Sequence, residues 1–294
     1  MKYYLKWLQI AENFFIGLFF ILKWRFGYIK DTYYLSAFRE NRRLTFSDDF
    51  NRDYLDITKW NYPYGWGKTD TRVSSYSKSE ENIMIHNGKI KLNVKKESGI
   101  SNDWYEPVPY TYTHSSIDTN NKFFQTYGRW EASIKVANNK RLWPAFWLLT
   151  KTWQDDRRKG YNGNKDNIMP EIDIFEHFGG ENNKYKDMIF TYHCGASYDK
   201  SEHIFFPTHI KHLNFSRGFL VYSIEWTEDY IKWYVNDSLV KVFRFKYLSD
   251  KRDIANKPCY IILDDIVNWE NGDKYEKKYT LPDGMEVDWV RVYQ

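Results

Sequence analysis

Three acidic residues lie within six positions of a segment that is otherwise apolar. The segment 170–176 (PEIDIFE) has the pattern of a short β-strand, in which side chains alternate between two faces. Glu171 and Asp173 then share one face, while Ile172 and Ile174 point to the other. Carboxyl groups that lie close together raise one another's pKa, so one can stay protonated while another is ionised. Catalysis by a carboxylate nucleophile and a carboxylic acid needs that division.

Strict alternation places the third acid on the wrong face. Glu176 lies five positions after Glu171, and this odd offset would bury its carboxylate on the core side, unpaired and at high cost. A single β-bulge near Ile174 or Phe175 would return Glu176 to the face of the other two acids. On a flat strand the Cα atoms of Glu171 and Glu176 would still be about 13 Å apart. We therefore expect a curved, twisted sheet that brings the carboxyl groups together, and a solvated acidic strand is the alternative.

Short apolar or alternating runs, separated by turn residues, recur from residue 44 onward, and no long helical periodicity follows that point. Asn-Gly at 87–88 and Asn-Asp at 236–237 fit hairpin turns. The expected strands are 89–94, 129–136, 143–149, 171–176, 188–193, 219–226, 231–235, 260–263 and 286–293. This spacing predicts one all-β domain over residues 44–294, a sandwich or a barrel.

Residues 1–43 differ in composition from the rest of the chain. An apolar run over 14–22 has basic residues on both sides. It is shorter than the roughly 20 residues that span a bilayer, and no small-residue cleavage site follows it. We expect a short helical segment for targeting or membrane contact, and hence an extracytoplasmic protein. An ordinary helix packed on the domain is the alternative.

The composition is rich in aromatic residues, with 25 Tyr, 20 Phe and 13 Trp. Aromatic faces stack on sugar rings, although an aromatic core would account for the same excess. The net charge of +4 is spread along the chain, and no nucleic-acid-binding motif is present. Cys194 and Cys259 have no metal-ligand spacing, and we expect two free buried thiols, with one disulfide as the alternative.

The segment 171–176 (EIDIFE) resembles the E-x-D-x-x-E signature of glycoside hydrolase family 16, in its bulged form. Other segments match the family in the same order, so the resemblance extends from about residue 44 to the last residue. These segments are 127–132 (YGRWEA), 143–149 (WPAFWLL), 222–226 (YSIEW), 231–235 (IKWYV) and 285–294 (MEVDWVRVYQ).

The resemblance implies a concanavalin A-like jelly-roll sandwich of two curved antiparallel sheets. It also implies an enzyme that cleaves internal β-linkages of a polysaccharide with retention of configuration. We expect the protein to be a monomer. Glu171 would be the nucleophile, Glu176 the general acid/base and Asp173 the assisting carboxylate. A β-1,3- or β-1,3-1,4-glucan is the expected substrate. A sulfated or acidic galactan, a transglycosylase and a factor that processes surface polysaccharides stay open.

Four further residues are candidates for contact with the substrate. Trp143 and Trp147 are four positions apart on one strand and so share a face, although core packing is the alternative. Trp153 lies in the long polar connection 151–167, which we expect to form a wall of the sugar subsites, with a mobile solvated loop as the alternative. By the resemblance, His193 lies at a strand position where bulged members carry a histidine in the groove.

The chemistry requires no cofactor, but many family members carry a structural calcium ion on the convex side. The matching positions are Asp49, the backbone carbonyl of Gly88, and Asp288, with solvated turn acids as the alternative. Two positions depart from the family pattern: Ser133 replaces a common Arg, and Asp264 replaces a usual Asn. We expect both changes to alter sugar contacts.

Overall fold

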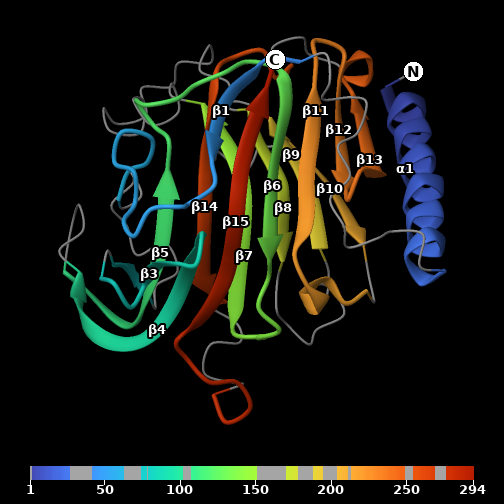
Figure 1. Cartoon of the computed structure of the whole chain (residues 1–294). Coiled ribbons are helices and arrows are strands. Elements are labelled where there is room, and N and C mark those ends of the chain that lie inside the picture. Colours follow the sequence, from blue (N-terminus) through green and yellow to red (C-terminus); the bar gives the residue numbers. More distant parts are fainter. Residues whose placement is uncertain are drawn as a thin grey trace.

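The computed structural model describes residues 2–26, 42–62, 74–77, 79–101, 107–150, 170–177, 188–194, 204–210, 213–248, 254–268 and 276–294. Within these ranges the chain forms one α-helix and fifteen β-strands (Figure 1). The helix α1 spans Lys2–Arg25, and two short 3₁₀ helices are η1 (Phe215–Arg217) and η2 (Phe245–Tyr247). The strands are β1 (Leu44–Asp48), β2 (Ser74–Tyr76), β3 (Ile83–His86), β4 (Lys89–Ser101), β5 (Val108–Asp118), β6 (Gly128–Lys135), β7 (Leu142–Thr150), β8 (Glu171–His177), β9 (Met188–Cys194), β10 (Ile204–Ile210), β11 (Leu220–Trp226), β12 (Tyr230–Val235), β13 (Ser238–Arg244), β14 (Cys259–Val267) and β15 (Asp283–Tyr293).

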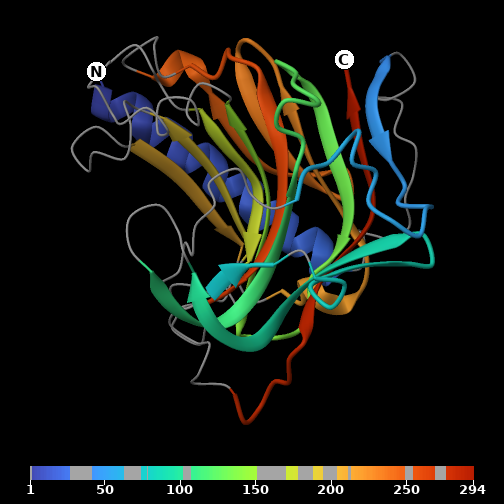
Figure 2. The same cartoon turned by 90° about the vertical axis from the view of Figure 1, so that its left-hand side faces the viewer.

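The strands join in one continuous sheet that folds over into two layers (Figure 2). We call the run β10-β9-β8-β7-β14-β5 the front sheet and the run β4-β15-β6-β11-β12-β13 the back sheet. The long strands β4 and β5 pair with each other and connect the two layers at one edge. β1 and β3 extend the back sheet, and β2 is the one parallel strand among the pairs described, beside β5. The predicted jelly-roll sandwich is confirmed.

The hydrophobic core lies between the two sheets. On β6 of the back sheet Trp130, Ala132 and Ile134 point inward, and on β8 of the front sheet Ile172 and Ile174 do so. Each of these side chains is at most 1% exposed. Alternation on β8 therefore places Glu171 and Asp173 on the outward face of the front sheet.

The same alternation corrects one expectation. Ser133 lies between Ala132 and Ile134 on β6, and so faces away from the core on the outer side of the back sheet. The acids lie on the other layer, so the expectation that Ser133 alters sugar contacts is wrong. Asp264 lies on β14 of the front sheet, opposite Ala145 of β7, and shares the outward face of its strand with Ile262.

Helix α1 packs along β13, the edge strand of the back sheet (Figure 1). The side-chain amide of Asn13 donates to the backbone oxygen of Val242 and accepts from its backbone nitrogen, both at 2.9 Å. Glu12 forms a two-bond ion pair with Arg244, at 2.8 and 3.2 Å. An edge strand exposes unpaired backbone groups, and here a helix covers them. The predicted N-terminal helix is present and is packed on the domain; within the described residues no helix is long and apolar enough to cross a bilayer.

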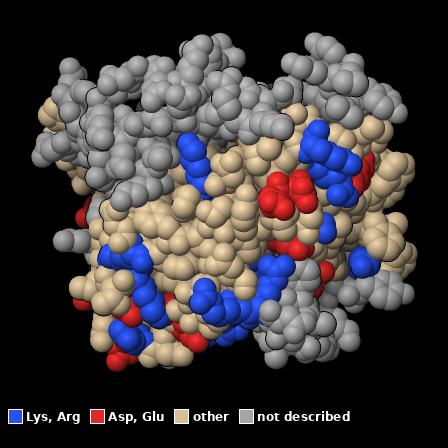
Figure 3. All heavy atoms as spheres, turned by 90° about the horizontal axis from the view of Figure 1, so that it is seen from above, with Lys and Arg blue, Asp and Glu red and all other residues tan. Residues whose placement is uncertain are grey.

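The cysteines and the surface charge agree with expectation. Cys194 and Cys259 are free thiols and both are buried. On the face shown in Figure 3, basic and acidic side chains lie close to each other around a broad area of other residues. The basic residues on this face therefore do not form one continuous block.

Candidate active site

β8 carries the three acids, and its pairing is interrupted between Asp173 and Glu176. Where β7 advances by one residue β8 advances by two, which leaves Ile174 as the extra residue. Ile174 and the next residue, Phe175, are both buried in the core. Two consecutive inward side chains return Glu176 to the outward face of Glu171 and Asp173. The predicted bulge is confirmed at the predicted position.

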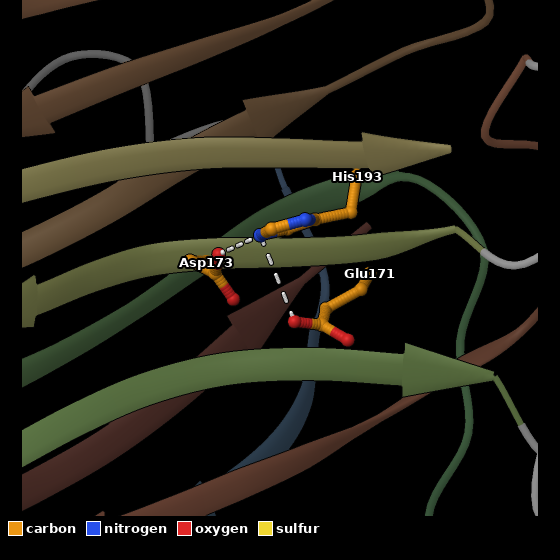
Figure 4. A group of neighbouring side chains, drawn as sticks. All are labelled: Glu171, Asp173 and His193. Atoms are coloured by element: carbon orange, nitrogen blue, oxygen red, sulfur yellow. Dashed lines mark hydrogen bonds and ion pairs between the residues drawn. The ribbon is translucent and has the colours of Figure 1, made fainter. Parts of the chain in front are cut away.

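His193 lies beside the acids on the neighbouring strand. It is directly opposite Glu171 in the pairing of β8 with β9. Its Nε2 atom is 2.8 Å from Asp173 Oδ2 and 3.7 Å from Glu171 Oε1 (Figure 4). The side chain is 18% exposed, so the ring can still meet a ligand on the outward face. The residue predicted for the groove is thus placed as a direct partner of the carboxylates.

Asp173 and Glu176 share a hydrogen bond, and their ionisation is linked. Burial and the neighbouring Asp173 carboxylate raise the pKa of Glu176 to about 8, against the opposing effects of the charge of His193 and a hydrogen bond from Trp143. Burial also raises the pKa of Asp173, to about 7, although Lys241 opposes this shift. Near neutral pH the pair therefore holds a proton, with Glu176 as its principal carrier. A carboxylic acid that stays protonated at this pH is suited to be a general acid.

The two tryptophans of β7 share the outward face, as predicted, but their surroundings differ. The indole nitrogen of Trp143 donates to Glu176 Oε1 at 3.2 Å. Trp147 is 7% exposed and lies opposite Asp173 in the strand pairing. It packs with Leu149 and Tyr260 in a small cluster on that face. Trp143 therefore has a direct electrostatic role at the acid, besides any stacking on a sugar.

Two residues that sequence reasoning missed support the bulge from the core side. Trp233 of β12 donates its indole N–H to the backbone oxygen of Asp173 at 2.8 Å. Lys241 of β13 donates to the backbone oxygen of Phe190, on β9, at 2.7 Å. A buried lysine has no local signature in a sequence, since an isolated Lys in a strand is normally assigned to the surface.

Trp153 and the connection 151–167 fall outside the described residues. Glu171, Asp173 and His193 have ligand atoms within 4.8 Å of one another, a spacing that a metal ion could also occupy. In this structure His193 hydrogen-bonds directly to Asp173, and Asp173 shares a proton with Glu176. These contacts are those of a hydrogen-bonded acid pair, and we assign no ion to this group.

The calcium positions fit an ion poorly as they are arranged. A guanidinium nitrogen of Arg291 donates to Asp49 Oδ1 at 3.0 Å, so a cationic side chain already occupies one proposed ligand. Gly88 has a φ of +68°, and a side chain there would meet the amide oxygen of Asn51 at 2.8 Å. That oxygen is a further hard donor beside Gly88.

With this geometry known, the comparisons decide the family. The model of glycosyl hydrolases family 16 matches residues 70–291. The chain belongs to this family. The assignment, with the described sandwich, confirms the predicted family, fold and glycosidase class.

Named relatives and solved structures agree with the assignment. The chain is 28% identical to the glucan endo-1,3-beta-glucosidase A1 of Niallia circulans over 273 residues, which is 85% of this chain but 38% of that protein. It is 28% identical to the beta-glucanase of Rhodothermus marinus over 267 residues, which is 85% of each. The structure of LamAcat from Zobellia galactanivorans superposes with a TM-score of 0.68 at 26% identity, over 89% of this chain and 100% of that one. The family 16 chain thus spans well under half of the Niallia protein and most of the Rhodothermus enzyme.

Proposed function

We propose that this family 16 protein is a retaining endo-glycosidase that cleaves internal β-linkages of a β-1,3- or β-1,3-1,4-glucan. The observation that carries the proposal is the bulge of β8, which places three carboxyl groups on one face. Burial and the Asp173 carboxylate raise the pKa of Glu176 there to about 8. The names of the Niallia and Rhodothermus relatives support a glucan as the substrate.

In the proposed first step the carboxylate of Glu171 attacks the anomeric carbon. The bond from that carbon to the leaving-group oxygen breaks, and Glu176 gives its proton to that oxygen. In the second step a water molecule attacks the anomeric carbon of the glycosyl ester. Glu176, now ionised, takes a proton from the water, and the ester bond to Glu171 breaks. Two inversions give overall retention, and both steps use the same acid/base.

Asp173 and His193 assist this cycle without attacking the sugar. Before the first step the ionised Asp173 accepts a hydrogen bond from the protonated Glu176, and its negative charge helps Glu176 to keep the proton that the leaving group needs. The 2.8 Å contact with His193 orients Asp173 and supplies a partner for its charge. We propose that Trp143, Trp147 and Trp153 contact sugar rings around this centre, the role that the sequence predicts for them.

The test is hydrolysis of a panel of β-glucans and sulfated galactans by the full chain and its Glu171→Ala variant. Released reducing ends and the anomer formed first are followed. We expect β-anomeric oligosaccharides from one glucan, and a loss of at least about a thousand-fold in kcat on substitution. Glu286→Gln is the matched control, since Glu286 lies on the back sheet, paired with Lys135. Unchanged release by the Glu171→Ala variant, or α-anomeric first products, would contradict the proposal.

The remaining expectations are proposals of the same kind. We propose a monomer that acts outside the cytoplasm, with membrane contact through residues 1–43, supported by the outward apolar side chains of α1. We also propose that the chemistry needs no cofactor and that any calcium at Asp49, Gly88 and Asp288 is structural. Unfolding in EDTA and in added Ca²⁺ tests the last point: because Ca²⁺ must displace Arg291 from Asp49, a Tm that does not respond would remove calcium from the proposal.

A further inference from the structure

Helix α1 has an inverted distribution of polar and apolar side chains. The side that faces the domain carries Gln9, Glu12 and Asn13, which bind the edge strand β13 through their polar groups. Phe20 and Trp24 complete this inner side and are buried. The opposite side faces away from the protein, yet its large side chains are apolar. A surface helix of a globular domain has the reverse arrangement.

The outward face is large and continuous. Of the fourteen large hydrophobic side chains that are exposed in the described chain, nine lie on α1 or directly after it. At 100° per residue they fall within about half of the helix circumference. These residues are Trp7, Leu8, Ile10, Phe14, Phe15, Leu18, Phe19, Leu22 and Phe26, and Phe15 is 67% exposed. Contiguous patches of this kind mark an interaction surface, whereas single exposed hydrophobics do not.

The charges of the helix indicate what covers this face. The sequence of α1 contains four basic residues, at positions 2, 6, 23 and 25, and a single acid, Glu12. Arg244 neutralises Glu12 on the inner side, so no acidic group lies on the outward face. Aromatic and aliphatic side chains between basic ends are typical of a helix that lies in the plane of an anionic lipid surface.

We propose that α1 docks the domain onto an anionic lipid surface, with its outward face among the headgroups and the upper acyl chains. The inference is independent of the proposed hydrolysis, since it concerns the edge of the sandwich and not the outward face of the front sheet. The Asn13 and Glu12 contacts fix α1 to β13, so lipid binding would also fix the orientation of the sandwich relative to the surface.

The test is co-sedimentation of the full chain with vesicles of phosphatidylcholine that do or do not contain phosphatidylglycerol. The variant Phe14→Gln, Phe15→Gln, Phe19→Gln removes the centre of the face and keeps every contact to β13. We expect it to lower partitioning onto the anionic vesicles by about ten-fold or more. The matched control Ile57→Gln, Ile100→Gln removes two exposed hydrophobics elsewhere, 67% and 66% exposed, and should bind as the parent does. Circular dichroism and hydrolysis of a soluble glucan check that both variants are folded.

Three results would overturn the proposal. The parent chain could fail to sediment with either kind of vesicle. The triple variant could bind as tightly as the parent. Light scattering could instead show lipid-free self-association of the parent that the triple variant abolishes, which would assign the face to a second copy of the chain. Binding to anionic vesicles that weakens with salt, and is lost in the triple variant alone, supports a lipid surface.

The core beneath the acids contains a second irregularity. The pairing of β12 with β13 is shifted in register at a point that lies across the core from the bulge of β8. Trp233 and Lys241 face each other there, with the ammonium group 4.4 Å from the indole ring. Each crosses the core to a backbone oxygen beside the bulge, Trp233 to Asp173 and Lys241 to Phe190. Lys241 is 1% exposed.

We infer that Trp233 and Lys241 are positioning residues, which hold the bulged strand and its carboxyl groups in register. An alternating strand needs no such contacts, whereas a bulge leaves backbone oxygens without ladder partners. A buried ammonium group also costs free energy unless its surroundings use its charge. Burial lowers the pKa of Lys241 to about 7, against the Asp173 carboxylate, and the charged form of Lys241 in turn favours the ionised form of Asp173. The other titratable groups around the bulge in the described chain include Glu171, Glu176 and His177 on β8, His193 on β9 and Tyr222 on β11.

Lys241→Met keeps an unbranched side chain that is one heavy atom shorter, and it removes the charge and the donor. We expect kcat to fall by about ten-fold to a hundred-fold with little change in KM. The pH profile should move to higher pH, because loss of a nearby positive charge raises the pKa of Asp173 and retains the proton of the pair. Lys232→Met is the matched control, since Lys232 lies on the outer side of β12 against Tyr230.

If Lys241→Met does not fold, Trp233→Phe decides the question, because it removes one hydrogen bond and leaves an apolar ring. A folded Trp233→Phe or Lys241→Met protein with an unchanged kcat would refute a positioning role. A lower kcat at an unmoved pH profile in Lys241→Met would refute the part of the inference that concerns its charge.

Discussion

The hydrogen bond from Trp143 to Glu176 makes a sharp prediction about the pH dependence of the enzyme. The indole N–H stabilises the ionised form of the carboxyl, so the pKa of Glu176 lies lower than burial and Asp173 alone would place it. Trp143→Phe removes the donor and keeps an aromatic ring. The pKa of Glu176 should then rise above its value of about 8.

The size of the change follows from the geometry. A hydrogen bond to a charged group contributes about 1.5 to 3 kcal/mol. The 3.2 Å separation is at the long end for an N–H donor, so we take the lower limit. Since one pKa unit corresponds to about 1.4 kcal/mol, the pKa of Glu176 should rise by roughly one unit.

The assay is the pH profile of kcat/KM on a soluble glucan, because its limbs report the ionisations of the free enzyme. Glu176 must be protonated to release the leaving group, so activity is lost as pH rises through its pKa. In Trp143→Phe the basic limb should therefore move up by about one pH unit. The pH at which activity falls is the diagnostic quantity, whereas the maximum of kcat/KM also reflects any lost sugar contact. Trp289→Phe, on the back sheet, is the control. A basic limb that stays in place or moves to lower pH in Trp143→Phe would refute the reasoning.

Three further predictions test the acid pair, the buried histidine and the helix. Asp173→Asn should lower kcat and move the basic limb of the pH profile downward, because the Asp173 carboxylate raises the pKa of Glu176; a basic limb that moves up would contradict this. Burial lowers the pKa of His114 to about 3, below its unfolded value of about 6.5, so stability should fall as pH drops from 6.5 toward 3, by up to about 1.4 kcal/mol per pH unit. Urea unfolding at pH 7 and pH 4.5 should show a smaller difference for His114→Phe than for the parent. Asn13→Leu removes two backbone hydrogen bonds to Val242 and should lower the free energy of unfolding by about 1 to 3 kcal/mol, measured against Phe14→Leu on the outward face.

Much of the site could be predicted from whether the acidic residues are an odd or an even number of positions apart along one strand. An odd offset between Glu171 and Glu176 is incompatible with a shared face unless one residue is extra, and the bulge at Ile174 supplies it. The apolar neighbours on either side of Asp173 identified the core face of the same strand. Local spacing was sufficient here because the constraint acts within a single strand.

The partners of the acids could not be predicted in the same way. His193 meets Asp173 because β9 pairs with β8 in a particular register, and Trp143 meets Glu176 because β7 lies on the other side. These contacts depend on strand order, which local patterns do not fix. Ser133 shows the same limit: its departure from the family pattern predicts a change in sugar contacts, yet the residue lies on the other sheet.

The ionisation of the acids is therefore a property of the whole sandwich. Glu176 is acted on by Asp173 of its own strand, by Trp143 of β7 and by His193 of β9, while Lys241 of β13 acts on Asp173 from the opposite sheet. A general acid that is protonated at the working pH needs burial to raise its pKa. It must also release its proton, so other groups must limit that rise, or the pKa would lie far above the working pH. Trp143, His193 and Lys241 each oppose the effect of burial on the pKa of the acid pair. A substitution that removes the polar group at any of these three positions should thus move the basic limb of the pH profile to higher pH. A substitution at one of them that moves this limb to lower pH would contradict the role given to that residue.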